Sequence, residues 1–344
     1  MDLNKALMKE KEMIEKTIAI GSKVLYLTRR QCAGLGPDTE KTLELIKETL
    51  IQHGNKDYEM PAKIGIHPHE DVFYHAMPAY LPFQKACGMK WIECYPRNPK
   101  EYKLPQTSGL LILNEVLTGC PVAIMDATWL TAMRTPAVTA VAAAALHPDA
   151  ETFGMFGCGV QGIGHVEYAA KTLKKLKKIY VYDIHEDAMD HLLEAVKGKV
   201  EVEVVKGTSF EQVTKSCEVL SSATLITKEN ISAVKEEWIQ KGQTILPCDL
   251  NTFWEASIQR NADKYIVDSI DEHELFNGMG YFPEGMPEIT CETGELVAGK
   301  AKGREFKDEI IVCSNIGMSV CDMAMAKFIF DRALETNTGL LLDL

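Results

Sequence analysis

The stretch GMFGCGVQGIG, residues 154–164, decides the fold of this chain. Gly157, Gly159 and Gly162 form the pattern G-x-G-x-x-G, between the apolar run TFGMFG and a helical pattern that begins near Gln161. In such a strand–turn–helix unit the first glycine allows a tight turn, the second lets a pyrophosphate approach the backbone, and the third permits close helix–strand packing. The stretch predicts a dinucleotide-binding loop, and a glycine turn without a ligand is the alternative.

Downstream of the loop, strand and helix patterns alternate. The run KIYVYD, 178–183, ends in Asp183, near the expected place of the acid that binds the adenosine ribose diol. A carboxylate there repels a 2′-phosphate, so NAD is favoured over NADP, although a protonated His185 would soften that preference. Further strand–helix alternation to about residue 269 predicts a parallel sheet with right-handed crossovers.

Upstream of the loop lie about 150 residues of a different character. Between 59 and 125, short apolar runs are separated by Pro, Gly and His, which is typical of an antiparallel sheet. The Ala-rich segment 127–146 predicts a helix that Pro136 must either open or kink. We expect this leading domain to hold a substrate against the nicotinamide.

Composition excludes several classes of protein. The 344 residues carry a net charge of −12, which argues against nucleic acid or anionic membrane surfaces as partners. No run of about 18 apolar residues is present, and the first residues do not resemble a secretory signal. Ten scattered cysteines without a CxxC pair favour free thiols in a reducing cytosol. A cytoplasmic protein is therefore expected.

Several motifs together resemble the ornithine cyclodeaminase/mu-crystallin family, which includes an archaeal type of alanine dehydrogenase and ketimine reductases. In chain order they are MPAY (77–80), Lys90, DATWLTAMRTPAVTAVAAAAL (126–146), GCGVQG (157–162), PCD (247–249) and SNIGMSVCDMAMAK (314–327). The resemblance runs from about residue 24 to 335. It implies an α/β fold in which a Rossmann-like NAD-binding domain, 151–310, is inserted into an α+β substrate-binding and dimerisation domain, 1–150 completed by 311–344. It also implies a homodimer.

The resemblance assigns roles to individual residues. Arg134 would grip the substrate carboxylate with its planar fork, and Lys90 would contact that carboxylate and take part in proton transfer. Asp249, at the end of a predicted parallel strand, would be the base and amine anchor; a helix N-cap is the alternative. Besides the three glycines and Asp183, the positions that would line the cofactor are Thr135, Val160, Gln161, Ser314 and Asn315.

Two positions depart from the family pattern. Lys63 stands where an arginine is usual, which keeps the charge but loses the fork. His75 replaces the glutamate thought to hold the distal amine of ornithine, and a protonated histidine would repel an ammonium. Both residues would contact the substrate. The nearby HPHE, 67–70, could suggest a metal, but no further ligand pattern completes a site, so none is expected.

Three functions remain open. The first is an ornithine cyclodeaminase-like lyase, in which hydride passes from Cα to NAD, ammonia leaves and a cyclic imine recovers the hydride. The second is a net amino acid dehydrogenase or ketimine reductase acting on an amino acid or cyclic imine. Overall similarity favours the first, whereas His75 favours the second. The third is a mu-crystallin-like NAD(P)-dependent binder of a small ligand, against which Asp249 argues, because a pure binder needs no base.

Overall fold

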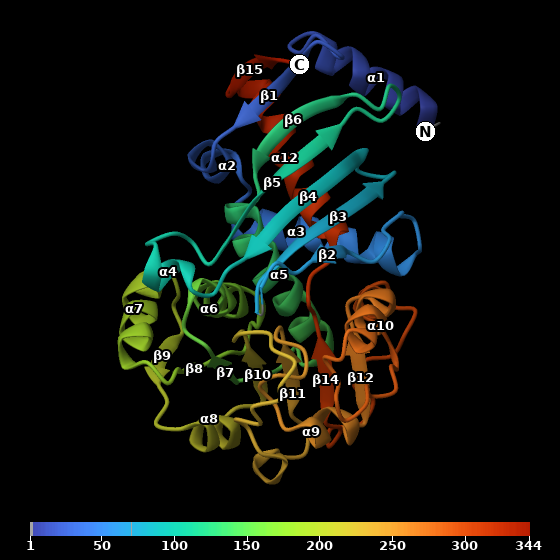
Figure 1. Cartoon of the computed structure of the whole chain (residues 1–344). Coiled ribbons are helices and arrows are strands. Elements are labelled where there is room, and N and C mark those ends of the chain that lie inside the picture. The colour runs from blue at the N-terminus through green and yellow to red at the C-terminus, as the bar shows by residue number, and fades with distance from the viewer. Residues whose placement is uncertain (1–2, 70) are drawn as a thin grey trace. The chain divides into compact units, whose positions relative to one another are not determined.

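The computed structural model describes residues 3–69 and 71–344, which cluster into two compact units (Figure 1). Among the described residues, unit 1 comprises those up to Arg134 together with Met318–Leu344, and unit 2 comprises Thr135–Gly317. The α/β fold class, with a Rossmann-like unit inserted in the chain of an α+β unit, is confirmed. The sequence predicts that the chain passes between the units at 151 and 311. In the structure it does so after Arg134 and after Gly317.

Unit 1 contains a mixed sheet with the order β15-β1-β6-β5-β4-β3-β2. Neighbouring strands from β2 to β6 pair antiparallel, as the turn-separated runs predict, whereas β1 is parallel to β6 and antiparallel to β15. The strands are β1 (Lys23–Leu27), β2 (Ile64–Ile66), β3 (Phe73–Leu81), β4 (Ala86–Cys94), β5 (Thr107–Asn114), β6 (Pro121–Asp126) and β15 (Leu340–Asp343).

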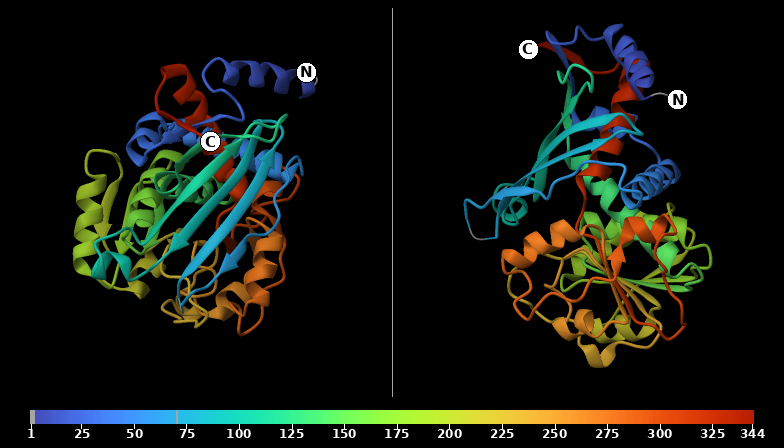
Figure 2. Two further views of the ribbon diagram at one scale, coloured as in Figure 1. Left: turned by 45° about the horizontal axis from the view of Figure 1, so that its top comes forward. Right: turned by 90° about the vertical axis from the view of Figure 1, so that its right-hand side faces the viewer.

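Helices cover one face of this sheet. The C-terminal helix α12 packs on β3, β4 and β5 and on α2 and α3, an arrangement that Figure 2 shows from two sides. Because successive side chains of a strand point to opposite faces, burial alternates along β4: Lys90 and Ile92 are buried, while Trp91 between them is exposed. The helices of unit 1 are α1 (Leu3–Glu15), α2 (Arg29–Leu35), α3 (Thr39–Gly54), α4 (Asn98–Glu101) and α12 (Ser319–Thr336).

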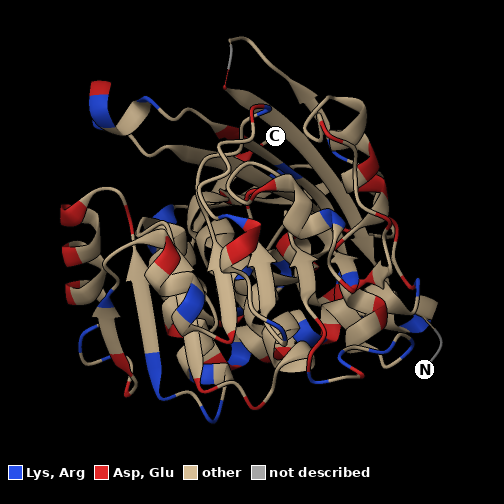
Figure 3. Cartoon of the chain, turned by 90° about the horizontal axis from the view of Figure 1, so that it is seen from below, with Lys and Arg blue, Asp and Glu red and all other residues tan. Residues whose placement is uncertain are grey.

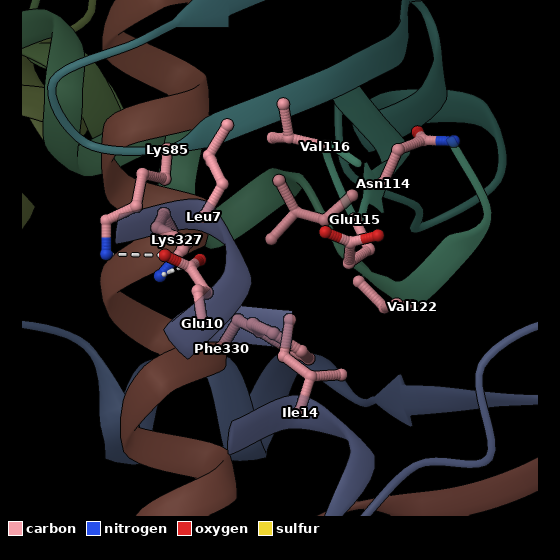
Figure 4. A pocket seen from close by; sticks show the side chains of 11 residues that line it. Leu7, Glu10, Ile14, Lys85, Asn114, Glu115, Val116, Val122, Lys327 and Phe330 are labelled. Atoms are coloured by element: carbon pink, nitrogen blue, oxygen red, sulfur yellow. Dashed lines mark ion pairs between the residues drawn. The ribbon is translucent and has the colours of Figure 1, made fainter. Parts of the chain in front are cut away.

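An ion-pair cluster attaches α1 to this core. Glu10 of α1 is buried and pairs with Lys85 at 2.5 Å and with Lys327 of α12 at 2.9 Å, as the dashed lines in Figure 4 show. The adjoining cavity, lined also by Glu115 and Phe330, has a volume of about 10 Å³. That is room for one water molecule and too little for an amino acid.

Unit 2 contains a parallel sheet with the order β13-β12-β14-β11-β10-β7-β8-β9. Its first strand in sequence, β7, lies between β8 and β10, so the strand order reverses there. The strands are β7 (Thr152–Phe156), β8 (Lys178–Tyr182), β9 (Glu203–Lys206), β10 (Val219–Ser222), β11 (Thr244–Pro247), β12 (Lys264–Val267), β13 (Cys291–Glu292) and β14 (Ile311–Ser314). The α-helices are α6 (Val160–Thr172), α7 (Glu186–Val196), α8 (Phe210–Ser216), α9 (Ala256–Arg260), α10 (Ile270–Gly278) and α11 (Thr293–Val297), and Glu236–Trp238 form a 3-10 helix.

Two elements explain where the chain passes between units. Helix α5 (Thr128–Leu146) contains Pro136 in its interior, so this proline does not open the helix, and Ala142, Ala143 and Leu146 join the core of unit 2. Strand β14 lies between β11 and β12 of the parallel sheet. The C-terminal part of the substrate domain, predicted to begin at 311, therefore begins only after this strand, at Met318.

The surface carries charges of both signs. Figure 3 shows acidic and basic residues interspersed over helices and loops, with no extended basic area in that view. Within residues 3–69 and 71–344, no helix is both long and apolar enough to cross a membrane.

Candidate functional site

The glycine loop of unit 2 has a separate steric reason for each glycine. Gly157 has φ +91°, and a Cβ there would lie 2.7 Å from the carbonyl oxygen of Ala223. A Cβ on Gly162 would lie 2.1 Å from the carbonyl oxygen of Gly157, so only glycine lets α6 approach the turn this closely. Gly159 is the N-cap of α6, and a Cβ there would have no atom of the other described residues within 4 Å, its two chain neighbours apart.

Asp183 is fixed against the loop at the end of β8. Its Oδ2 accepts a hydrogen bond from the backbone N–H of Cys158 at 2.8 Å, and its Oδ1 accepts one from His185 at 3.0 Å. Gly157 donates its N–H to the carbonyl of Tyr182 at 3.0 Å, which draws the ends of β7 and β8 together. The acid expected to bind a ribose diol therefore lies beside the expected pyrophosphate cradle.

The other predicted cofactor residues have mixed surroundings. Val160 is 66% exposed in the first turn of α6, and Gln161 Oε1 is buried without a hydrogen-bond partner among the described residues. Ser314 and Asn315 are buried: the Ser314 hydroxyl contacts His273 Nε2 at 3.1 Å, and Asn315 Oδ1 accepts from Thr293 at 2.8 Å. Thr135 is the first residue of unit 2, and its carbonyl accepts from Thr139.

These observations fit a dinucleotide. Gly159 offers open backbone where a pyrophosphate would come, α6 begins there without a side-chain cap, and Gln161 supplies a buried polar atom with no hydrogen-bond partner among the described residues. The loop lies at the carboxyl end of β7, next to the reversal of strand order, where open α/β sheets bind ligands.

In unit 1, two predicted substrate residues meet through Asp322, a residue to which the sequence motifs assign no role. Lys90 Nζ lies 2.6 Å from Asp322 Oδ2, and Arg134 Nε lies 2.9 Å from Asp322 Oδ1. All three side chains are buried, with exposures of 1%, 6% and 0%. They come from β4, α5 and α12, so three elements converge on one carboxylate.

A signal for Asp322 was present in the sequence. It stands in the run VCDMAMAK, where the neighbouring residues are apolar over more than a helical turn. An aspartate on the buried face of a helix needs a cationic partner, because an unpaired buried charge is strongly unfavourable. The sequence could have predicted that partner, but not that two cations share it.

Burial and charge together set the protonation of this triad. Burial lowers the pKa of Lys90 to about 8, although the charge of Asp322 opposes that change, and Arg134 and Lys63 add to it. Burial alone would raise the pKa of Asp322, but the charges and hydrogen bonds of Arg134 and Lys90 reverse this and hold it below its usual value. The carboxylate is therefore ionised, and Lys90 can exchange a proton near neutral pH.

The two residues that depart from the family pattern belong to the same unit. Lys63 and His75 are buried, and His75 stacks on Phe73 with ring centres 4.0 Å apart. Burial, reinforced by the electrostatic effects of Lys63, His67 and Lys90, lowers the pKa of His75 to about 3. His75 is thus neutral at physiological pH and neither repels an ammonium by charge nor replaces a carboxylate.

Asp249 lies in unit 2 and is fully buried after β11. Its Oδ1 accepts from the hydroxyl of Ser222 at 2.7 Å, and its Oδ2 accepts from the N–H and hydroxyl of Thr224 at 3.0 and 2.7 Å. Burial raises its pKa, and these hydrogen bonds oppose the rise. The alternative of a helix N-cap is wrong, because α9 begins only at Ala256 and has Glu255 as its N-cap.

Metal ligands are not gathered in the described chain. Within residues 3–69 and 71–344, no group of three or more His, Cys, Asp or Glu side chains is placed to hold a metal ion. His67 and His75 have ring centres 6.1 Å apart. Glu70 of the HPHE motif lies outside the described residues.

Comparison with known proteins gives a consistent result. Residues 37–337 match the ornithine cyclodeaminase/mu-crystallin family. The nodulation efficiency protein NfeD of Rhizobium meliloti is 32% identical over 318 residues, which cover 92% of this chain and 97% of that protein.

Two solved structures share the fold at moderate identity. The Δ1-pyrroline-2-carboxylate reductase of Thermococcus litoralis, in complex with NADH and L-proline, is 27% identical with a TM-score of 0.81, over 92% of this chain and 99% of that one. An archaeal alanine dehydrogenase dimer with bound NAD is 26% identical with a TM-score of 0.81, over 93% and 99%. The resemblance inferred from the sequence motifs is confirmed.

Proposed function

The chain belongs to the ornithine cyclodeaminase/mu-crystallin family, and on that premise we propose that it is an NAD-dependent enzyme interconverting an α-amino acid and its imine. The observation that carries the proposal is the buried pair of cations Lys90 and Arg134, held by one carboxylate. Such a pair in an apolar interior suits a small acid, because desolvated charge-assisted hydrogen bonds are the strong ones.

NAD is the proposed cofactor, and it supplies a hydride acceptor or, when reduced, a hydride donor at the nicotinamide ring. In the chain, Gly159 leaves the backbone open to the pyrophosphate, and α6 presents its first N–H groups. Asp183 binds the ribose diol and disfavours a 2′-phosphate. The NAD complexes of the two solved relatives support this choice.

Lys90 and Arg134 hold the substrate through its carboxylate. Arg134 is oriented by the hydrogen bond from its Nε to Asp322, and its guanidinium pairs with the carboxylate. Lys90, with a pKa of about 8, also moves a proton to or from the substrate nitrogen. Asp249 is the second proton acceptor, favoured by its raised pKa and aligned by Ser222 and Thr224.

His75 supports a net dehydrogenase or imine reductase over a cyclodeaminase. A diamino acid that cyclises needs its distal ammonium held, and the family residue for this is a glutamate. His75 is neutral and packed on Phe73, so it gives no anionic partner at that position. A reductase of cyclic imines or a dehydrogenase of a simple amino acid makes no such demand. This agrees with the names of the two solved relatives.

The proposal predicts a redox change coupled to nitrogen chemistry. The protein is mixed with NAD and a panel of amino acids while NADH absorbance and ammonia are followed; in reverse, NADH is offered with cyclic imines, or with 2-oxo acids and ammonia. We expect NADH and ammonia in equal amounts, or NADH consumed by a cyclic imine. Ammonia without net NADH would instead indicate a cyclodeaminase. If the protein bound NAD but no member of the panel changed the NADH absorbance or released ammonia, an enzymatic role would be contradicted and the mu-crystallin-like binder favoured.

We also propose a homodimer formed through the open face of the sheet in unit 1. Trp91 and Leu110 lie directly opposite each other on β4 and β5, are 38% and 47% exposed, and Tyr74 stacks on Trp91 with ring centres 5.5 Å apart. An exposed apolar patch on a sheet face is typical of an interface. The dimeric state of the archaeal alanine dehydrogenase supports this assignment.

The dimer is tested by charging that face. Trp91→Glu combined with Leu110→Glu is expected to convert a dimer into a monomer in light scattering, because two carboxylates would be buried without partners. Phe306→Glu is the control, since Phe306 is 72% exposed in unit 2 and its change should leave the mass unaltered. A dimer that survives the double change, or a wild-type monomer, would contradict the assignment.

A further inference from the structure

The carboxylate of Asp322 divides its two oxygens between two cations. We propose that Asp322 is a positioning residue for the carboxylate-binding site: by bridging Lys90 and Arg134, it fixes their spacing and keeps the amine of Lys90 charged. The inference rests on the proposed function, since it assumes that these two cations bind the substrate acid.

The geometry gives Asp322 both tasks. One oxygen contacts Lys90 Nζ and the other contacts Arg134 Nε, so neither cation can turn away without breaking a buried contact. Asp322 lies in the first turn of α12, where the helix dipole favours a negative charge. Helix α12 is buried along most of its length, which makes it a rigid support.

The charges that face Lys90 come from several elements, and most of them oppose its protonation. Arg134 of α5 and Lys63 before β2 are like charges, and His75 of β3 is neutral at physiological pH. Burial acts in the same direction as Arg134 and Lys63, lowering the pKa of Lys90, and Asp322 alone among these influences raises it. Loss of Asp322 would therefore release the proton of Lys90 at a lower pH.

The experiment measures the titration of Lys90 directly. Protein labelled with ¹³C-lysine is titrated by NMR without substrate, and the signal of Lys90 is identified by its absence from Lys90→Arg. In Asp322→Asn we expect the Lys90 midpoint to fall by about one pH unit or more. With a substrate found in the amino acid panel, the alkaline decline of kcat/KM should move to lower pH by the same amount, because a neutral Lys90 no longer holds the carboxylate.

Two variants separate positioning from simple loss of structure. Asp322→Glu keeps the charge, so it should restore the midpoint towards that of the wild type even if it lowers the Tm. Asp331→Asn removes an ion pair with Lys327, at 2.7 Å on the same helix, and should leave Lys90 unchanged. An unchanged midpoint in Asp322→Asn overturns the inference.

The wild-type titration keeps the inference testable if Asp322→Asn does not fold: a Lys90 that is mostly neutral at pH 7 would also overturn it. If no amino acid of the panel is turned over, only the proposed function is contradicted, because the titration midpoint of Lys90 is measured without substrate.

Discussion

Lys90→Met is expected to lower kcat/KM for the amino acid or imine substrate by about 10³-fold. Methionine fills the same apolar space on β4 but removes both the charge that pairs with the substrate carboxylate and the group that moves a proton. Because Lys90 touches the reacting molecule in the proposed reaction, both kcat and the substrate affinity should fall. Steady-state kinetics with the substrate identified by the panel measure both parameters.

Binding of NAD serves as the internal control for this variant. All proposed cofactor residues belong to unit 2, whereas Lys90 belongs to unit 1, so NAD affinity measured by calorimetry should not change. Lys100→Met, at an exposed position after β4, is the matched control and should retain full activity. If Lys90→Met kept its activity and its Tm, Lys90 would be a structural partner of Asp322 and no more.

The sequence predicts the arrangement of unit 2 well because its signals are local. A strand, a glycine turn and a helix follow each other between 152 and 172, and each glycine has a steric demand that its own neighbours impose. The position of Asp183, at the end of the next strand, is predicted from its distance in sequence to the glycine loop. Parallel strands joined by helices leave few alternative topologies, so the sheet order is largely determined by these patterns.

The proposed substrate residues are harder to predict, because their surroundings depend on contacts between distant segments. Asp322 and Lys90 are 232 positions apart in the sequence. The hydrophobic pattern of α12 does not predict which strand this helix packs against, and in the structure β4 is one of them. The protonation of His75 likewise follows from its burial beside Lys63 and Lys90. Strand β14 shows the same limit: its pattern predicts a strand, but only tertiary pairing assigns it to unit 2.

Gly159→Val is expected to weaken NAD binding by at least about 100-fold while lowering the Tm only by the small cost of a valine at an N-cap, and it is the most direct test of the nucleotide cradle. Gly159 has φ −76°, so a β-branched residue meets no left-handed strain, and beyond its chain neighbours no atom of the described residues lies within 4 Å of a Cβ placed there. The added side chain therefore enters only the space that the pyrophosphate would occupy. Fluorescence or calorimetric titration with NAD measures the loss.

Two other glycines, one in the same loop and one at the end of α10, give the contrast that makes this result interpretable. Gly162→Ala places a methyl 2.1 Å from the carbonyl oxygen of Gly157, so it should lower the free energy of unfolding by about 1–3 kcal/mol as well as weaken NAD binding. Gly278→Val, at an exposed position with no atom within 4 Å, should change neither property. If Gly159→Val bound NAD as the wild type does, the loop would be a glycine turn without a nucleotide, and Lys90 and Arg134 would have to serve a ligand that needs no hydride.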